Sequence, residues 1–185
     1  MMSHQGITNT EQANTLRSIT KYSEGTEMVN IQVLKEIGLL KGLDDSELAK
    51  IAELCHERTL DAGMPYFAQG NNATELHLCR SGRVDIIVRL REPWGIEVTV
   101  HTVKGGGIFG WSSLVEPYIY TASAKCVERT EDIYIKAAAL TKLFEQNPNI
   151  GYVLMRNLAA VISSRLTEYR QKLSLEIAAT IRKEW

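Results

Sequence analysis

The sequence predicts an α+β fold that is mainly β, with helices at both ends and short antiparallel strands between them. The clearest β signal lies in residues 83–91, where apolar side chains occupy positions 84, 86, 88 and 90 and charged ones positions 83, 85, 89 and 91. This alternation is typical of a strand with one buried and one solvated face. The clearest helical signal lies in residues 147–185, where Pro148 is the only proline and Gly151 the only glycine.

The N-terminal part of the sequence is predicted to form an arm followed by helices. Residues 1–27 are rich in Thr, Asn, Gln, Ser and Glu and show no sustained period, so we expect a flexible arm. From residue 29 to residue 60 the pattern is helical, and one apolar face is formed by Leu48, Ile51, Ala52 and Cys55. Asp44 is the predicted N-cap of a helix, and Glu47 stands in capping-box position.

The centre, about residues 61–136, contains further predicted strands. Ile96, Val98 and Val100 alternate with polar residues, as do Ala122, Ala124 and Cys126. Glycines at positions 63, 70, 82, 95, 105–107 and 110 separate these segments. Several short strands with turn signals between them predict a sandwich, a barrel or a jelly roll.

The C-terminal part predicts a short helix over residues 137–146 and a long one that starts with Asn147 as N-cap. The apolar stripe of the long helix is Leu154, Leu158, Ile162, Leu166, Tyr169, Leu173, Ile177 and Ile181. Its mean step of about 3.9 residues exceeds the 3.5 of a heptad seam, so the stripe drifts around the helix. One small β domain cannot cover such a stripe. We therefore expect a homodimer that forms through Leu154, Leu158, Ile162, Leu166 and Tyr169.

The predicted organisation is thus an arm (1–27), a β domain (28–146) and a C-terminal helix (147–185). With 185 residues, a net charge of −1 and a pI near 6.4, the chain lacks the basic excess of a general nucleic-acid binder. The sequence shows neither a membrane span nor a secretory signal, and we expect a cytoplasmic protein.

The three cysteines, Cys55, Cys79 and Cys126, are widely spaced, which favours reduced and partly buried thiols over disulfides. His77, Cys79, His101 and Glu75 offer only a poor metal or haem site, and packing against a β core is the better explanation for them. We expect neither a metal nor a cofactor.

A glycine-rich turn is the most informative segment. Gly105, Gly106, Gly107 and Gly110 lead into a short helical stretch from Trp111 to Val115. The first amides of such a helix have no internal partners and carry a partial positive charge, which makes the turn a candidate anion site.

The order and spacing of several short motifs resemble the cyclic nucleotide-binding domain of the catabolite activator and fumarate–nitrate regulator (CRP/FNR) superfamily. The resemblance covers roughly residues 30–170. The matching pieces are Leu40–Leu43, Asp61–Gly63, Gln69–Gly70, Leu76–Val84, Gly107–Gly110, Thr121–Ser123, Asn157–Ala159 and Ile162–Leu166. The resemblance implies an eight-stranded jelly roll, a phosphate-binding cassette at Phe109–Ser123 and a C-terminal dimerisation helix.

Two cassette positions depart from the family pattern. Where the family's cyclic-nucleotide binders have a glutamate for the ribose, this chain has Trp111, and Tyr120 replaces their arginine for the cyclic phosphate. A lost charge-assisted contact weakens affinity about 10- to 100-fold, so cyclic AMP or cyclic GMP is a doubtful ligand. Lys104 and Arg89 are alternative partners for a phosphate, and Glu116 for a ribose. The aromatic replacements either fill the site or line a pocket for a less polar effector.

The leading hypothesis is a non-enzymatic sensor that binds a small anionic or aromatic effector and signals through its C-terminal helices. The candidate ligand-binding residues are Gly107, Phe109, Gly110, Trp111, Ser112, Ser113, Tyr120, Thr121, Ala122 and Ser123. The alternative is a degenerate domain that acts as a protein–protein interaction module. The family's transcription factors carry a winged helix-turn-helix after the long helix, and no such segment follows here, so we expect no direct DNA binding.

Overall fold

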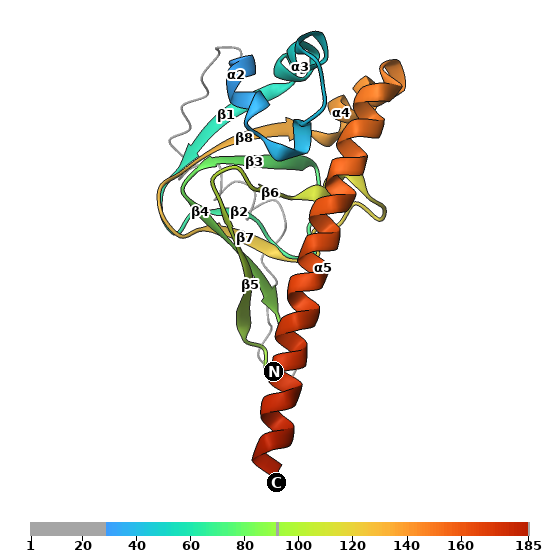
Figure 1. The fold of residues 1–185 in the computed structure, drawn as a ribbon. Helices are drawn as coiled ribbons and strands as arrows, with labels where there is room; N and C mark the ends of the chain where they lie inside the picture. The colour runs from blue at the N-terminus through green and yellow to red at the C-terminus, as the bar shows by residue number, and fades with distance from the viewer. Residues whose placement is uncertain (1–28, 92, 185) are drawn as a thin grey trace, which may run out of the picture.

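The computed structural model of the protein describes residues 29–91 and 93–184 and contains two four-stranded antiparallel sheets with helices at one end (Figure 1). The arm predicted over residues 1–27 lies outside the described residues. The sheets have the strand orders β1-β8-β3-β6 and β2-β7-β4-β5. Eight strands in two sheets confirm the α+β class and the jelly-roll architecture.

The N-terminal segment forms three short helices, α2 (Ile31–Lys35), the 3₁₀ helix η1 (Gly38–Leu40) and α3 (Asp45–Ala52). The predicted capping box is confirmed at α3. The Glu47 amide donates to the Asp44 carboxylate at 2.9 Å, and the Asp44 amide donates to Glu47 at 3.0 Å.

The helical prediction is wrong for residues 55–60, which form strand β1 (Cys55–Leu60). This strand pairs along its whole length with β8 (Thr130–Lys136). Without β1, one edge of β8 would expose unpaired backbone groups, and this long-range pairing outweighs the local helical pattern.

Six further strands are present in the described residues, and they keep the predicted alternation only in part. They are β2 (Pro65–Phe67), β3 (Glu75–Ser81), β4 (Arg83–Arg89), β5 (Glu97–Lys104), β6 (Ile108–Phe109) and β7 (Ser123–Cys126). In β3, Leu76 and Leu78 face the core beneath the helices, whereas Cys79 belongs to a second core that includes Val84 and Phe109. The three cysteines are buried and unpaired, and burial raises the pKa of Cys79 to about 11.

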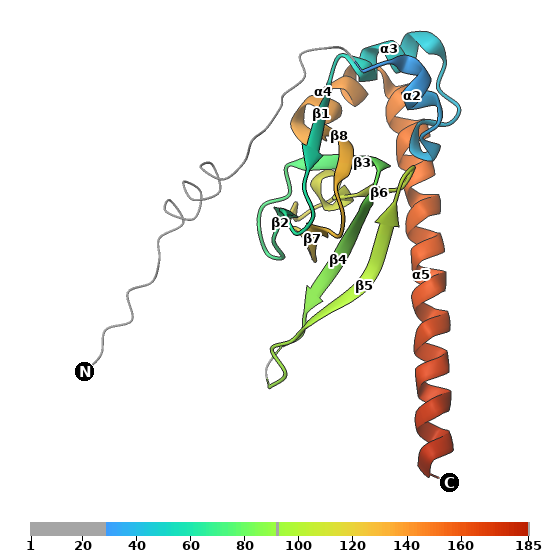
Figure 2. The ribbon, with the colours of Figure 1, turned by 90° about the vertical axis from the view of Figure 1, so that its left-hand side faces the viewer.

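The β4–β5 hairpin projects beyond the rest of the domain (Figure 2). Near the domain its apolar residues Val84 and Val103 are fully buried, as the alternation predicts. At its outer end the prediction of a buried face is wrong, because Leu90 and Val98 are exposed and Ile96 is 55% exposed. In Figure 2 this end of the hairpin extends away from the sheets and from α5.

Helices α4 (Ala137–Gln146) and α5 (Pro148–Glu184) follow β8, and α5 has 37 residues. Leu154 and Leu158 are buried in the core of their own chain, whereas Ile162, Leu166 and Tyr169 are exposed. Each four-residue step advances the stripe by roughly 40° beyond a full turn, which carries it off the domain within three steps. Among the described helices, none combines the length and apolar character needed to cross a membrane.

Candidate ligand-binding site

The cassette begins with a turn whose shape requires glycine. Gly110 has φ 76°, and a Cβ there would lie 2.8 Å from the Glu75 carbonyl oxygen and 2.9 Å from His77 Cδ2. The 3₁₀ helix η2 (Trp111–Leu114) starts directly after it, as the sequence predicts. Any bulkier residue at position 110 would push the cassette away from β3.

Tyr120, which replaces the family's phosphate arginine, points into the jelly roll. Its ring stacks on Phe67 at a centroid distance of 3.7 Å and an interplanar angle of 5°, and the residue is 5% exposed. Its hydroxyl donates to the Glu75 carbonyl and accepts from the Glu75 amide, both at 3.2 Å. Burial raises the pKa of the Tyr120 hydroxyl, so it stays neutral and serves as a structural anchor.

The space left in the cassette is small. This cassette cavity has a volume of about 60 Å³, room for about two water molecules at ~30 Å³ each. It is lined by Phe67, Ile86, Phe109, Gly110, Trp111, Ser112, Tyr120, Thr121 and Ala122. The structure therefore brings together seven of the ten predicted ligand-binding residues, around a space that is nearly filled.

The other three predicted residues lie elsewhere. Gly107 forms part of the β5–β6 turn, where its amide donates to Lys104. The Ser123 hydroxyl accepts from the Gln69 amide at 2.9 Å. Ser113 is buried on the side of η2 that faces α4 and does not line the cassette cavity.

The alternative ligand contacts suggested by the sequence are not at the cassette. Lys104 lies opposite Arg83 at one end of the β4–β5 hairpin, and Arg89 lies opposite Glu97 at the other. Glu116 lies in the exposed loop after η2. None of these three predicted substitutes lines the cassette cavity or the larger space beside it.

That larger space, the C-helix cavity, lies between the jelly roll and α5 and has a volume of about 370 Å³. Its walls are mostly aliphatic and aromatic, and it shares Ile86, Trp111, Thr121 and Ala122 with the cassette cavity. The complete lining is Ile86, Val88, Val100, His101, Trp111, Thr121, Ala122, Arg165 and Tyr169. A volume of this size suits a small organic molecule.

Arg165 and His101 supply the polar groups of the C-helix cavity. Arg165 Nη1 lies 3.0 Å from His101 Nδ1 and 3.4 Å from the Glu168 carboxylate. Because guanidinium groups only donate, Nδ1 accepts this bond and the proton of the neutral ring is on Nε2. His101 Nε2 is shielded from solvent and has no hydrogen-bond partner within the described residues. Burial, and then the charge of Arg165, lower the pKa of His101 and keep the ring neutral.

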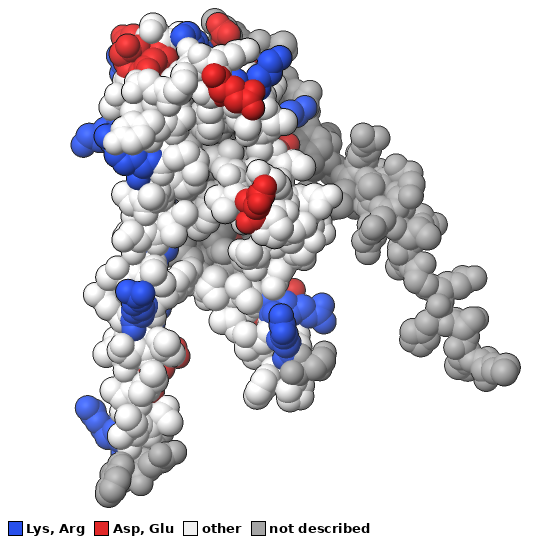
Figure 3. Space-filling view, turned by 90° about the vertical axis from the view of Figure 1, so that its right-hand side faces the viewer, with Lys and Arg blue, Asp and Glu red and all other residues white. Residues whose placement is uncertain are grey.

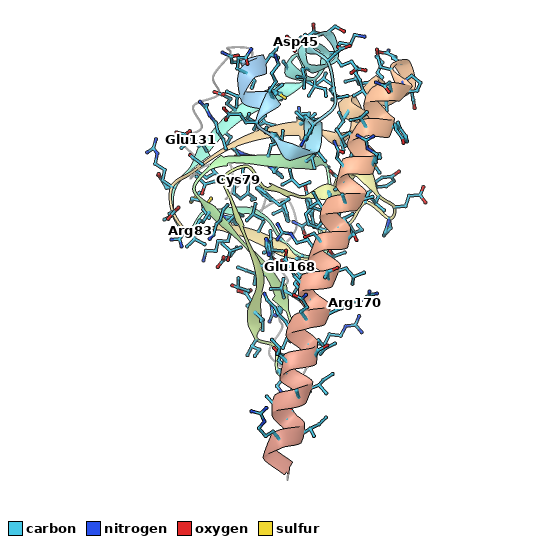
Figure 4. The ribbon with its side chains drawn as sticks, in the orientation of Figure 1. Asp45, Cys79, Arg83, Glu131, Glu168 and Arg170 are labelled. Atoms are coloured by element: carbon cyan, nitrogen blue, oxygen red, sulfur yellow. The ribbon has the colours of Figure 1, made fainter. Side chains whose placement is uncertain are left out.

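Sequence reasoning did not identify Arg165 or His101 as ligand contacts, and it assigned Tyr169 to dimerisation. Positions 165 and 169 lie one helical turn apart on α5. They line the cavity together with residues of strand β5, which are far away in the sequence. In Figure 4 Glu168 lies on the side of α5 that faces the sheets, while Arg170 extends away from them. The available signal was an arginine with the apolar residues Val161, Ile162 and Tyr169 at helical spacing around it.

A second arginine–histidine group lies inside the jelly roll. In this interior network, His77 Nδ1 lies 3.0 Å from Asp132 Oδ2 and 3.1 Å from Arg58 Nη2, and Arg58 contacts Asp132 at 3.4 Å. Glu75 lies 3.5 Å from Arg58 at the edge of the network. His77 and His101 are thus held in separate places, and no group of three potential metal-ligating residues occurs in the described part of the chain.

Known proteins share this architecture. Residues 57–147 match the family described as cyclic nucleotide-binding domain. The solved structure of a candidate cyclic nucleotide-binding protein from Geobacter metallireducens GS-15 is 32% identical, with a TM-score of 0.66. The match covers 75% of this chain and 99% of that one. The chain belongs to the cyclic nucleotide-binding domain family.

Two named relatives place this domain within longer proteins. The cyclic AMP receptor protein of Thermus thermophilus is 30% identical over 142 residues, which are 77% of this chain and 63% of that protein. Glutaminase 1 of Bradyrhizobium diazoefficiens is 26% identical over 166 residues, 85% of this chain and 24% of the relative. The chain therefore spans less than two thirds of either relative. Within this cyclic nucleotide-binding domain, the cassette cavity is small and the adjoining C-helix cavity is several times larger.

Proposed function

We propose that this cyclic nucleotide-binding-like domain is a non-enzymatic sensor whose ligand occupies the C-helix cavity. The supporting observation is the difference between the two adjoining spaces, about 60 Å³ in the cassette and about 370 Å³ beside α5. Tyr120 and Phe67 close the first, whereas the second touches both the jelly roll and α5.

The walls of the C-helix cavity suit a ligand with an apolar or aromatic body and one anionic group. Val88, Val100 and Trp111 offer apolar surface to the body. Arg165 offers a guanidinium to the anion, and the His101 N–H is a further donor without a partner. A carboxylate or phosphate that accepts hydrogen bonds from Arg165 would share the guanidinium N–H groups with His101 Nδ1 and the Glu168 carboxylate.

A ligand in this position would signal through α5, because Arg165 and Tyr169 form one wall of the cavity. Ile162, Leu166, Leu173 and Ile177 leave an apolar stripe exposed on an adjacent face of the same helix. We assign this exposed stripe to a homodimer interface. Leu154 and Leu158, which the sequence also suggested for this interface, are buried in the core of their own chain. The ligand shifts the dimer only if it binds two arrangements of α5 with different affinity.

Calorimetry tests the proposal. The probes are cyclic AMP, cyclic GMP, indole-3-carboxylate and its uncharged amide, with the wild type, Arg165→Gln and the exposed control Arg170→Gln. We expect the carboxylate to bind better than its amide, and Arg165→Gln to weaken its binding about 10- to 100-fold. Equal binding of acid and amide, or an affinity unaffected by Arg165→Gln, would contradict the assignment.

The cassette is tested with the double variant Trp111→Glu, Tyr120→Arg. Binding of cyclic AMP by the double variant but not by the wild type would show that the scaffold is intact and that its specificity has been altered by these two residues. Strong cyclic AMP binding by the wild type would contradict a closed cassette.

A second candidate function is a protein-interaction module, favoured by the closed cassette and the exposed stripe of α5. Light scattering after gel filtration measures whether the protein is a homodimer or a monomer. Leu166→Glu is the test variant, and Thr167→Glu at the neighbouring position is the control. A homodimer that only Leu166→Glu dissociates supports the proposed seam. A monomeric wild type that also binds none of the probes favours the interaction module.

A further inference from the structure

A third cavity lies apart from the cassette cavity and the C-helix cavity. This α4 cleft has a volume of about 740 Å³ and opens between the start of β3, the cassette loop and helix α4. It shares no lining residue with the cassette cavity or the C-helix cavity. Figure 3 shows the face of the molecule on this side, where charged side chains gather over the helices at the top and the middle is largely uncharged.

One end of the cleft is rich in hydrogen-bond donors. Helix α4 starts in its wall at Ala137, and no side chain caps this start. The Ala137 amide donates to Thr74, while Ala138 in the next position lines the cleft. The free amides of a first helical turn carry partial positive charge, and Lys136 adds a full charge beside them.

Ser113 provides an independent sign of a missing partner. The residue is 3% exposed and belongs to the wall of the cleft, and its hydroxyl has no hydrogen-bond partner among the described residues. Buried hydroxyls are nearly always paired, because leaving one unpaired costs stability. A ligand group that bonds Ser113 would remove that cost.

The cleft also has two acidic residues. Glu75 is the cross-strand neighbour of Lys136 in the pairing of β3 with β8, and its carboxylate lies 3.5 Å from Arg58 and 3.8 Å from His77 in the interior network. Glu145 is eight residues beyond Ala137, roughly 12 Å further along the helix axis. Lys142 lies between these two ends. The free amides of α4 and Lys136 thus lie at one end of the cleft, and Glu145 lies toward the other.

We propose that the α4 cleft is a second ligand site, which takes a small organic anion with its anionic group at the start of α4, near Lys136 and Ser113. The apolar walls hold the body of the molecule, and the half-exposed ring of Tyr118 lies at the cleft. The Tyr118 carbonyl accepts from the Ala73 amide at 2.7 Å, which fixes the cassette loop to β3.

Occupation of this site would connect the cassette loop to α5. Helix α4 packs tightly on α5 at Gly151, where an added Cβ would lie 3.0 Å from Phe144 Cβ. A ligand that joins Ser113 to α4 therefore contacts an element that cannot move without moving the start of α5. The site stands independently of the function proposed for the C-helix cavity.

Amide chemical shifts in two-dimensional ¹⁵N NMR spectra test the site, with benzoate, phenyl phosphate and uncharged benzyl alcohol as probes. We expect saturable shifts of the Ala138 and Ala139 amides with at least one of the two anions and none with the alcohol. The anion that binds more tightly identifies the head group as a carboxylate or a phosphate.

Variants separate this site from surface charge and from the C-helix cavity. Lys136→Gln should weaken the binding about three- to tenfold, while the control Lys104→Gln and the cavity variant Arg165→Gln should not. Ser113→Ala should raise the melting temperature of the free protein and yet weaken binding, a combination that a purely structural role would not produce. Absence of saturable shifts in the wild type, or affinities unchanged in both Lys136→Gln and Ser113→Ala, would overturn the proposal.

Discussion

The interior network and the C-helix cavity each contain an arginine next to a histidine, but the two pairs differ in what surrounds them. Inside the jelly roll, Asp132 bonds both His77 and Arg58. Beside α5, Arg165 bonds His101 and Glu168, while His101 Nε2 is left without a partner near a space of about 370 Å³.

The difference shows how the same side chains serve structure in one place and binding in the other. A buried group whose hydrogen bonds are all made within the protein gains no further bond from a ligand. An unpartnered donor beside an open volume gains a bond when a ligand arrives. Pairing and space, rather than residue type, therefore separate the two regions.

Removing Asp132 should have the largest effect on stability. Asp132→Ala leaves the Arg58 charge buried without its main partner, and we expect a loss of about 3–5 kcal/mol in the free energy of unfolding. The matched change beside α5, Glu168→Ala, affects a side chain that is 44% exposed and should cost less than about 1 kcal/mol. Urea denaturation measures both, and similar losses in the two variants would contradict the contrast.

Tyr120→Phe tests the wall that closes the cassette. The substitution keeps the ring stacked on Phe67 but removes the hydroxyl that bonds the backbone of Glu75, so we expect a loss of about 1–2 kcal/mol. The control is Tyr118→Phe, at a half-exposed ring in the same loop, which should be nearly neutral. An equally neutral Tyr120→Phe would show that the hydroxyl does not anchor the cassette.

Acid should destabilise the protein through both histidines. Burial lowers the pKa of His77, and burial followed by the Arg165 charge lowers that of His101. Below about pH 6.5 the unfolded chain therefore binds more protons than the folded one, and stability falls as the pH drops toward the folded-state pKa values.

The fully buried His77 contributes at most about 1.4 kcal/mol per pH unit to this loss. Unfolding measured between pH 7 and pH 5 should show the decline, with a shallower slope in His101→Gln. A stability that is constant over this range, or that rises on acidification, would contradict the neutral state assigned to the two rings.

Local patterns predicted the fold better than they predicted the site. The Asp44–Glu47 capping box depends on neighbours within a few residues and is present, and the segment predicted as a strand from its alternation forms β4. Strand β1 was predicted as helix because its partner residues in β8 lie 70 to 80 positions away in the chain. The pairing of His101 with Arg165 spans 64 residues, and the inward turn of Tyr120 depends on Phe67, so no local pattern reveals either.

The electrostatic link between Arg165 and His101 can be isolated without any ligand. Arg165→Gln removes a positive charge 3.0 Å from the ring, so the pKa of His101 should rise while burial still keeps it below the ordinary value. Arg170→Gln, on the opposite side of the same helix (Figure 4), should leave that pKa unchanged. NMR titration of the His101 ring protons measures the shift. An unchanged pKa in Arg165→Gln would mean that the guanidinium does not face His101 in solution, and the C-helix cavity would then lose the group proposed to recognise an anion.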